Sequence, residues 1–204
     1  MYNHPTLFED KESTMLIGIV GPAYAGKSAV SKRLVESLCG DYSIIPFAKP
    51  LKDLARWFGW DGKKDDRGRV FLQTLGTEIG RCYNRDFWVD KWLEAVGGTA
   101  TLNCDIIRTA NVISDDVRFD NEVDAILRHQ GIVVCVNASL ETRRRRAEAK
   151  GEKLPPQHAS EAWQSLKYGL TVMNEDGELD KVVEQIAKYM TETNREMESN
   201  RNRS

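Results

Sequence analysis

The residues Gly21-Pro22-Ala23-Tyr24-Ala25-Gly26-Lys27-Ser28 have the types and spacing of a phosphate-binding loop, GxxxxGK[ST]. Glycines let the backbone turn tightly and point its N–H groups inward, toward phosphate oxygens. In this pattern Lys27 reaches the β- and γ-phosphates, and the Ser28 hydroxyl group ligates Mg²⁺. The predicted chemistry is the binding of a nucleoside triphosphate, here ATP, with Mg²⁺. The pattern leaves open what happens to the γ-phosphate.

The segments on either side of the loop support this interpretation over a chance glycine loop. Residues 15–20 form a short apolar run typical of a buried parallel strand. Residues 29–38 carry apolar side chains at helical spacing, so a helix would direct its positive N-terminal end at the bound phosphates. The expected ATP-binding residues of the loop are Gly21, Ala23, Ala25, Gly26, Lys27, Ser28 and Ala29.

Two carboxylates and an arginine follow the predicted strand 111–114. Asp115 or Asp116 could hold Mg²⁺ directly or through water, or act only as a helix cap. We assign Asp115 with Ser28 to the metal, and Asp116 to catalysis and substrate binding. Arg118 lies at the edge of the sheet where ligands bind, and its guanidinium can grip a phosphate with two hydrogen bonds.

The helical segment 67–81 is unusually polar and is a candidate for the substrate site. Several of its side chains share a face and could line a pocket for an anionic, hydrogen-bonding substrate; an ordinary solvated face is the alternative. Trp88 could stack on a base, although core packing is the commoner role of an indole. The candidates in this region are Arg69, Gln73, Gly76, Thr77, Arg81 and Trp88.

Four consecutive arginines, 143–146, lie on a predicted helix over 139–150 with Ser139 as its N-cap. Neighbouring side chains on a helix point about 100° apart, so Arg143 and Arg146 share one side. We expect these two to reach the ATP phosphates from a lid, with Arg143 also catalytic; a solvated helix or a basic patch for nucleic acid is the alternative. His158 and Glu161 are expected to form hydrogen bonds to substrate rather than to bind metal.

Strands and helices alternate along the chain, which predicts an α/β fold of three layers: the P-loop NTPase fold with a five-stranded parallel sheet, helices on both faces and a small helical lid. A flexible leader (1–13) precedes a single domain (14–190), with an acceptor-binding helical region at about 50–98 and the lid at about 139–160. A polar tail over 191–204 is expected to be disordered. The expected strands are 15–20, 43–48, 111–114, 131–136 and 170–173.

Composition excludes several other classes of protein. The net charge of −2 disfavours wrapping of nucleic acid by bulk positive charge, although a local basic groove remains possible. The four cysteines form no CxxC pair and fit a reducing, cytoplasmic environment. No stretch approaches the roughly 20 apolar residues that span a membrane, so we expect no membrane partner. The guanine-reading NKxD pattern of GTPases is absent.

Five segments of the chain resemble the bacteriophage deoxynucleoside monophosphate kinases, in the same order. They are Phe47-Ala48-Lys49-Pro50-Leu51-Lys52, Leu72-Gln73-Thr74-Leu75-Gly76-Thr77-Glu78, Asp86-Phe87-Trp88-Val89, Asp116-Val117-Arg118-Phe119-Asp120-Asn121-Glu122 and His158-Ala159-Ser160-Glu161. The resemblance implies transfer of the γ-phosphoryl group of ATP to a deoxynucleoside 5′-monophosphate, in the cytoplasm of an infected bacterium. It implies an acceptor pocket formed by Arg69, Gly76, Thr77 and Trp88 and completed by Asp116, Arg118 and Glu122.

Two other functions stay open at this stage. A kinase of the same fold could phosphorylate a hydroxymethylated pyrimidine in phage DNA, with Asp115 or Asp116 as the base that an alcohol requires. A non-catalytic nucleotide-binding module would bind ATP without transferring phosphate. A homodimer is possible under the kinase interpretation, but no stretch of the sequence marks an interface.

Overall fold

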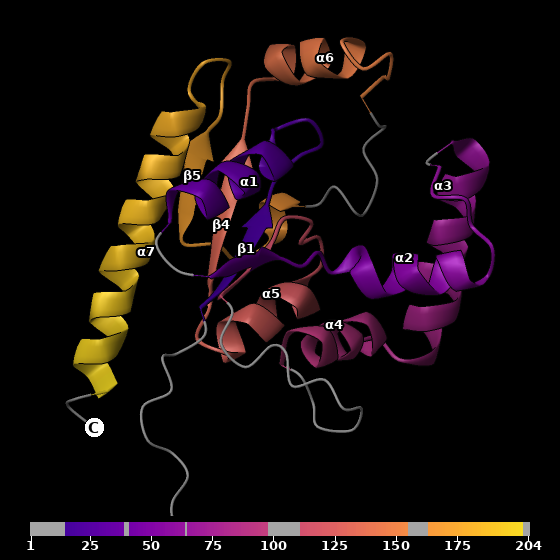
Figure 1. Cartoon of the computed structure of the whole chain (residues 1–204), viewed down its shortest axis with the longest axis horizontal. Helices are drawn as coiled ribbons and strands as arrows, with labels where there is room; N and C mark the ends of the chain where they lie inside the picture. The colour runs from indigo at the N-terminus through magenta and orange to yellow at the C-terminus, as the bar shows by residue number, and fades with distance from the viewer. Residues whose placement is uncertain (1–14, 39–40, 64, 98–110, 155–162, 202–204) are drawn as a thin grey trace, which may run out of the picture.

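The structure, a computed structural model, describes residues 15–38, 41–63, 65–97, 111–154 and 163–201 (Figure 1). Its centre is a five-stranded sheet in the order β2-β3-β1-β4-β5, in which every neighbouring pair is parallel. The sheet is therefore the one predicted from the sequence. The strands are β1 (Leu16–Val20), β2 (Tyr42–Ile44), β3 (Asn111–Ser114), β4 (Ile132–Asn137) and β5 (Leu170–Met173).

Helices cover both faces of the sheet and give the expected three layers (Figure 1). Two helices pack together on one face, α1 (Lys27–Ser37) and α7 (Leu179–Arg201). The other face carries α4 (Phe87–Gly97) and α5 (Asp120–Arg128). The residues of β1 alternate between the two cores, because successive side chains of a strand point to opposite faces: Ile17 and Ile19 pack with α1 and α7, Leu16 and Val20 with α4 and α5.

Three helical segments project to one side of the sheet as an arm: α2 (Ala48–Trp57), α3 (Asp66–Gln73) and the π-helix η1 (Thr74–Arg81) (Figure 1). Helix α4 ties the arm to the sheet. Trp92 of α4 is 1% exposed, stacks on Phe47 with ring centroids 4.1 Å apart, and donates its indole N–H to the backbone oxygen of Ile45 at 2.8 Å. A separate helix, α6 (Leu140–Glu148), lies over the loop between β1 and α1.

The second strand is shorter than the predicted 43–48. It ends at Ile44, and Phe47 and Ala48 already belong to the start of α2. Both oxygens of the Asp116 carboxylate accept backbone N–H groups there, from Phe47 at 2.7 Å and from Ala48 at 3.1 Å. These bonds satisfy N–H groups at the beginning of the helix that have no partner within it, so α2 begins at Ala48 and Pro50 lies in its first turn.

The predicted disorder of 191–204 is wrong over the described part, because α7 continues as one helix to Arg201. Extending an existing helix costs little, and the segment is rich in residues that favour helices. Met197 packs against the core on the α1 and α7 face, and Asn194 contacts the sulfur atom of Met15. The leader 1–13 lies outside the described residues.

No helix in the described ranges has the length and apolar character needed to cross a membrane.

Replacing Trp92 with Phe should lower the free energy of unfolding by about 1–3 kcal/mol, because the buried backbone oxygen of Ile45 loses its donor. The matched control is Trp57→Phe, since Trp57 is 79% exposed and should change stability little. Chemical denaturation followed by circular dichroism measures both variants. Equal stability of the two variants would contradict the anchoring role of Trp92.

Candidate nucleotide-binding site

The loop between β1 and α1 has the backbone conformation that phosphate binding requires. Gly21 has φ 135° and Gly26 has φ 90°, values that favour glycine. A Cβ atom on Gly21 would overlap the backbone oxygen of Val136 in β4, and one on Gly26 would overlap the side-chain amide of Asn174. Helix α1 begins directly afterwards at Lys27, so its unpartnered N–H groups and positive end face the loop. The loop therefore fits a polyphosphate.

Lys27 and Ser28 stand where the sequence predicts them. The Lys27 ammonium group donates to the backbone oxygens of Gly21 at 2.7 Å and Pro22 at 2.9 Å, so it lies across the loop. Ser28 is exposed, and Ala29 after it is exposed too. The residues expected to bind ATP, Gly21, Ala23, Ala25, Gly26, Lys27, Ser28 and Ala29, all lie on the loop after β1 and at the start of α1, with Ala25 buried.

The residues assigned to Mg²⁺ suit an ion that arrives with the nucleotide. Register pairs Gly18 of β1 with Ser114 of β3, so Asp115 follows at the same carboxyl edge as the loop. Over the described ranges, no group of three or more His, Cys, Asp or Glu side chains could hold a metal by itself. Mg²⁺ commonly uses one or two protein ligands together with phosphate oxygens and water. Ser28 and Asp115 fit that pattern.

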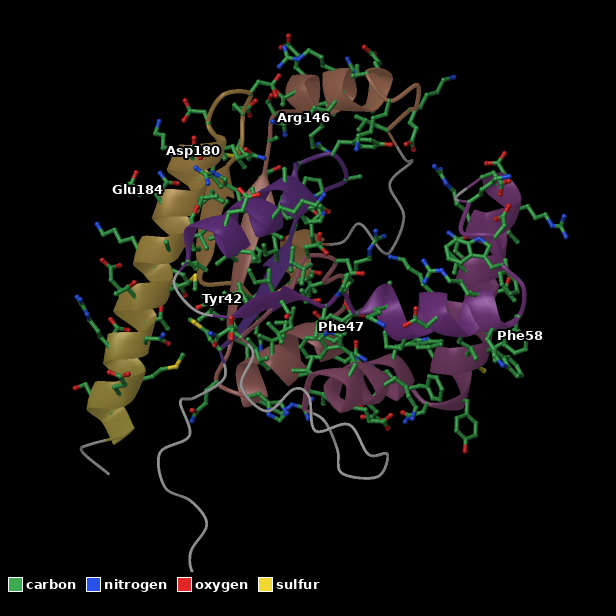
Figure 2. The ribbon with its side chains drawn as sticks, in the orientation of Figure 1. Tyr42, Phe47, Phe58, Arg146, Asp180 and Glu184 are labelled. Atoms are coloured by element: carbon green, nitrogen blue, oxygen red, sulfur yellow. The ribbon has the colours of Figure 1, made fainter. Side chains whose placement is uncertain are left out.

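Arg146 is part of the loop's support. Figure 2 shows it directed from α6 toward the phosphate loop. Its guanidinium donates to the backbone oxygens of Tyr24 at 3.3 Å, Ala25 at 3.2 Å and Asn174 at 2.9 Å, and it pairs with Asp176. Arg145 also pairs with Asp176. Two of the four arginines, Arg145 and Arg146, are therefore engaged within the protein.

Arg143 lies on the same helix but has a different environment. It is half-buried, and its Nε atom is buried without a hydrogen-bond partner among the described residues. Arg144 is exposed. Helix α6 begins as predicted, because the Ser139 hydroxyl accepts the N–H of Thr142. Of the two arginines expected to reach ATP, Arg146 supports the loop and Arg143 remains the candidate for the phosphates.

Asp116 has a structural role that the sequence did not reveal. Its carboxylate holds the start of α2 through Phe47 and Ala48, and the Ser114 hydroxyl contacts it at 3.4 Å. Burial raises the pKa of this carboxyl group, and the two backbone N–H bonds oppose that rise. A carboxylate with both oxygens already accepting is poorly placed to take a proton from a substrate.

Arg81 and Glu122 form a buried pair at the start of α5. Their side chains are 17% and 4% exposed and lie 2.8 Å apart. The guanidinium of Arg81 also stacks 3.8 Å from the ring centroid of Phe119. The other Glu122 oxygen accepts the backbone N–H groups of Arg118 and Phe119. Burial raises the pKa of Glu122, while these N–H groups and Arg81 oppose the rise. Arg81 is thus fixed in position, and the side chain of Arg118 beside it is exposed.

Glu152 links Arg69 to the phosphate loop. Glu152, which follows α6, accepts a hydrogen bond from Arg69 at 3.0 Å and one from the Tyr24 hydroxyl at 2.9 Å. Arg69 belongs to α3 and Tyr24 to the loop, so the arm and the donor site meet at this carboxylate. The acceptor candidates Gln73 and Thr77 lie exposed on the same arm.

Trp88 and Gly76 lie inside the arm rather than on its surface. The Trp88 indole is 4% exposed and donates to the backbone oxygen of Gly76 at 2.8 Å. Gly80 leaves no room for a side chain beside the same indole. These contacts accompany a π-helix over 74–81, whereas the sequence predicts an ordinary helix there. π-Helices are frequent at functional sites. Trp88 thus packs in the core, and the structure buries both Trp88 and Gly76, which the resemblance implies for the acceptor pocket.

Two residues expected at the site lie outside the described part of the chain, and four residues of the site were not identified from the sequence. His158 and Glu161 lie outside the described residues. Asn174, Asp176, Glu152 and Phe119 carry no motif, and only their contacts identify them. The composition of residues 174–177, Asn-Glu-Asp-Gly, is typical of a turn, but nothing in it indicates that Asn174 and Asp176 contact the phosphate loop and Arg146.

Comparisons with known proteins identify the fold and nothing finer. No protein-family model matches the chain, and no curated protein matches it. A shikimate kinase from Acinetobacter baumannii, solved with shikimate, is similar in structure: TM-score 0.51, 16% identity, covering 89% of this chain and 95% of that one. Together with the strand order, this likeness shows the P-loop NTPase fold.

Two further structures give slightly lower scores. A shikimate kinase from Aquifex aeolicus has a TM-score of 0.49 at 16% identity, covering 87% of this chain and 96% of that one. A sugar kinase from Janibacter sp. has a TM-score of 0.49 at 9% identity, covering 87% and 95%.

The pair between Arg146 and Asp176 should make stability depend on pH. The hydrogen bond from Arg146, with help from Arg145, lowers the pKa of Asp176. This stabilisation is present above the pKa of an unfolded aspartate, about 4, and is lost as the pH falls through the lower folded value. Asp176→Asn should therefore lower the melting temperature at pH 7 by at most a few degrees, and by progressively less as the pH falls below about 4.

Thermal unfolding across this pH range measures the effect. Asp124→Asn, at an exposed position of α5, serves as the control. A difference between wild type and Asp176→Asn that persists unchanged near pH 3 would show that the ion pair is not its source.

Proposed function

We propose that this protein is a kinase that transfers the γ-phosphoryl group of ATP to a deoxynucleoside 5′-monophosphate. One observation carries the proposal. The Glu152 carboxylate accepts hydrogen bonds both from Arg69, a candidate for binding the acceptor phosphate, and from Tyr24 of the phosphate loop. The proposed donor site and the proposed acceptor arginine would therefore adjoin. In-line transfer requires this adjacency, because most of the catalysis in phosphoryl transfer comes from positioning and charge stabilisation.

On the donor side, the loop N–H groups and Lys27 would hold the β- and γ-phosphates. Lys27 now donates to two backbone oxygens, so it would exchange those partners for phosphate oxygens when ATP binds. Arg143 would approach from α6. Mg²⁺, when bound through Ser28 and in part through Asp115, would neutralise charge that develops on the phosphates.

On the acceptor side, Arg81 and Arg69 would receive the monophosphate, with Arg118 beside them. The second pKa of a phosphate monoester is about 6, so its attacking oxygen is largely ionised at neutral pH and needs no general base. This suits the structure, in which both oxygens of Asp116 already accept backbone N–H groups. A phosphate acceptor is therefore favoured over an alcohol, for which Asp115 would have to serve as base.

The modified-DNA alternative has one observation in its favour. Two neighbouring aromatic side chains at the end of α2, Trp57 and Phe58, are 79% and 58% exposed. Residues 49–69 carry seven Lys and Arg against four Asp, whereas the whole chain is slightly acidic. Exposed aromatic rings among cations are a platform on which bases of single-stranded DNA stack. Figure 2 shows Phe58 at the outer end of the arm.

A single assay distinguishes the candidates: ADP release with each deoxynucleoside monophosphate, then with single-stranded DNA containing hydroxymethylated pyrimidine, then with neither. The proposal expects release that depends on a monophosphate and varies little with salt. Release that depends on DNA and falls steeply with salt would support the alternative. ATP binding without acceptor-dependent release would indicate a non-catalytic module.

Lys27→Ala should reduce phosphoryl transfer by at least about 100-fold while leaving the fold intact, because it removes a cation that stabilises the transferring phosphate. Lys32→Ala, at an exposed position of the same helix, should retain activity. Circular dichroism verifies folding, and coupled ADP release measures turnover. Near-normal turnover of Lys27→Ala would refute the assignment of the donor site.

A further inference from the structure

Glu152 connects three parts of the molecule that are distant in sequence. A single oxygen, Oε2, accepts from the Tyr24 hydroxyl, 128 residues away, and from an Nη atom of Arg69, 83 residues away. Tyr24 belongs to the phosphate loop, Arg69 to α3 of the arm, and Glu152 to the segment after α6. The carboxylate lies where the donor loop faces the arm.

Tyr24 is itself held in an unusual backbone conformation, with φ 62°. This left-handed region is uncommon for a residue other than glycine, and it directs the Tyr24 side chain out of the loop toward Glu152. Lys150 lies 5.9 Å from the centre of the same ring. Loop, arm and the end of α6 therefore converge on this one position.

The ion pair between Arg69 and Glu152 is weak enough to form and break reversibly. The Arg69 and Glu152 side chains are 55% and 43% exposed, and ion pairs at that exposure are weak because water competes for both charges. A phosphate dianion carries more charge than a carboxylate and offers more acceptor oxygens to a guanidinium. The pair is thus stable enough to orient Arg69 and weak enough to be replaced by a phosphate.

We propose that the Glu152 carboxylate occupies the place of the acceptor phosphate on Arg69. It holds Arg69 and α3 against the phosphate loop until the acceptor phosphate displaces it from Arg69. The assignment rests on the proposed function insofar as Arg69 binds the acceptor. Glu152 touches neither substrate in this scheme; it acts by competing for a residue that does. The negative charge of Glu152 beside the phosphate loop would also be repelled by the phosphates of bound nucleotide, which is a second reason for Glu152 to leave Arg69.

The decisive variant is Glu152→Gln, which keeps the size and one acceptor oxygen but removes the charge that competes with phosphate. The KM for the deoxynucleoside monophosphate should fall about two- to fivefold, as expected for loss of an exposed ion pair, while kcat changes less than twofold. Glu148→Gln, an exposed position on α6, is the matched control and should leave both constants unchanged. An unchanged or raised KM in Glu152→Gln would overturn the proposal.

A second measurement needs no substrate. Hydrogen exchange of the backbone amides of α3 should be faster in Glu152→Gln than in wild type or Glu148→Gln, because an uncharged amide holds Arg69 of α3 less firmly beside Tyr24. Unchanged exchange in α3 would refute the tie. If no monophosphate promotes ADP release by wild type, the proposed function fails, and the exchange measurement still decides whether Glu152 joins arm and loop.

Discussion

The conformation of the phosphate loop depends on two glycines that lie against other parts of the chain. Gly21 contacts the backbone of Val136 in β4, and Gly26 contacts Asn174 after β5. The Asn174 amide also donates to the backbone oxygen of Ala25 at 2.8 Å, and Arg146 bonds to the same oxygen. The loop therefore keeps its shape only when β4, β5 and α6 are in place. The nucleotide site is a product of the whole sheet rather than of the local motif.

The sheet and the phosphate loop could be predicted from the sequence because their signals are local. Strands β3 and β5 match the expected 111–114 and 170–173, and short apolar runs bounded by polar turns explain why. The Ser139 cap and the order of strands and helices are equally local. Errors of boundary appear where a distant side chain intervenes, as Asp116 does at the start of α2. The helix over 191–201 was missed because the prediction gave more weight to the polar composition of this segment than to the helix propensity of its residues.

The site beyond the loop was predicted only as a set of residues. Arg69, Arg81 and Glu122 were named from the sequence as candidates, but the partners that the structure gives Arg69 and Arg81 were not foreseen. The reason is separation along the chain: Glu152 and Phe119 carry no pattern that links them to an arginine far away. The π-helix of the arm is likewise invisible in sequence, since it depends on Trp88 packing against Gly76 and Gly80.

The two arginines proposed for the acceptor site, Arg81 and Arg69, differ in how firmly a carboxylate holds them, and burial is the cause. Breaking a buried pair such as Arg81–Glu122 costs about 3–5 kcal/mol, because the remaining charge stays in a poorly hydrated place. An exposed pair such as Arg69–Glu152 contributes about 1 kcal/mol or less. A single phosphate can replace the second carboxylate but not the first. Arg81 would then bind phosphate through N–H groups that Glu122 does not use, as a fixed part of the site. Arg69 would pass from Glu152 to the phosphate when the substrate arrives, so that the bound phosphate takes over the position that the carboxylate holds in its absence.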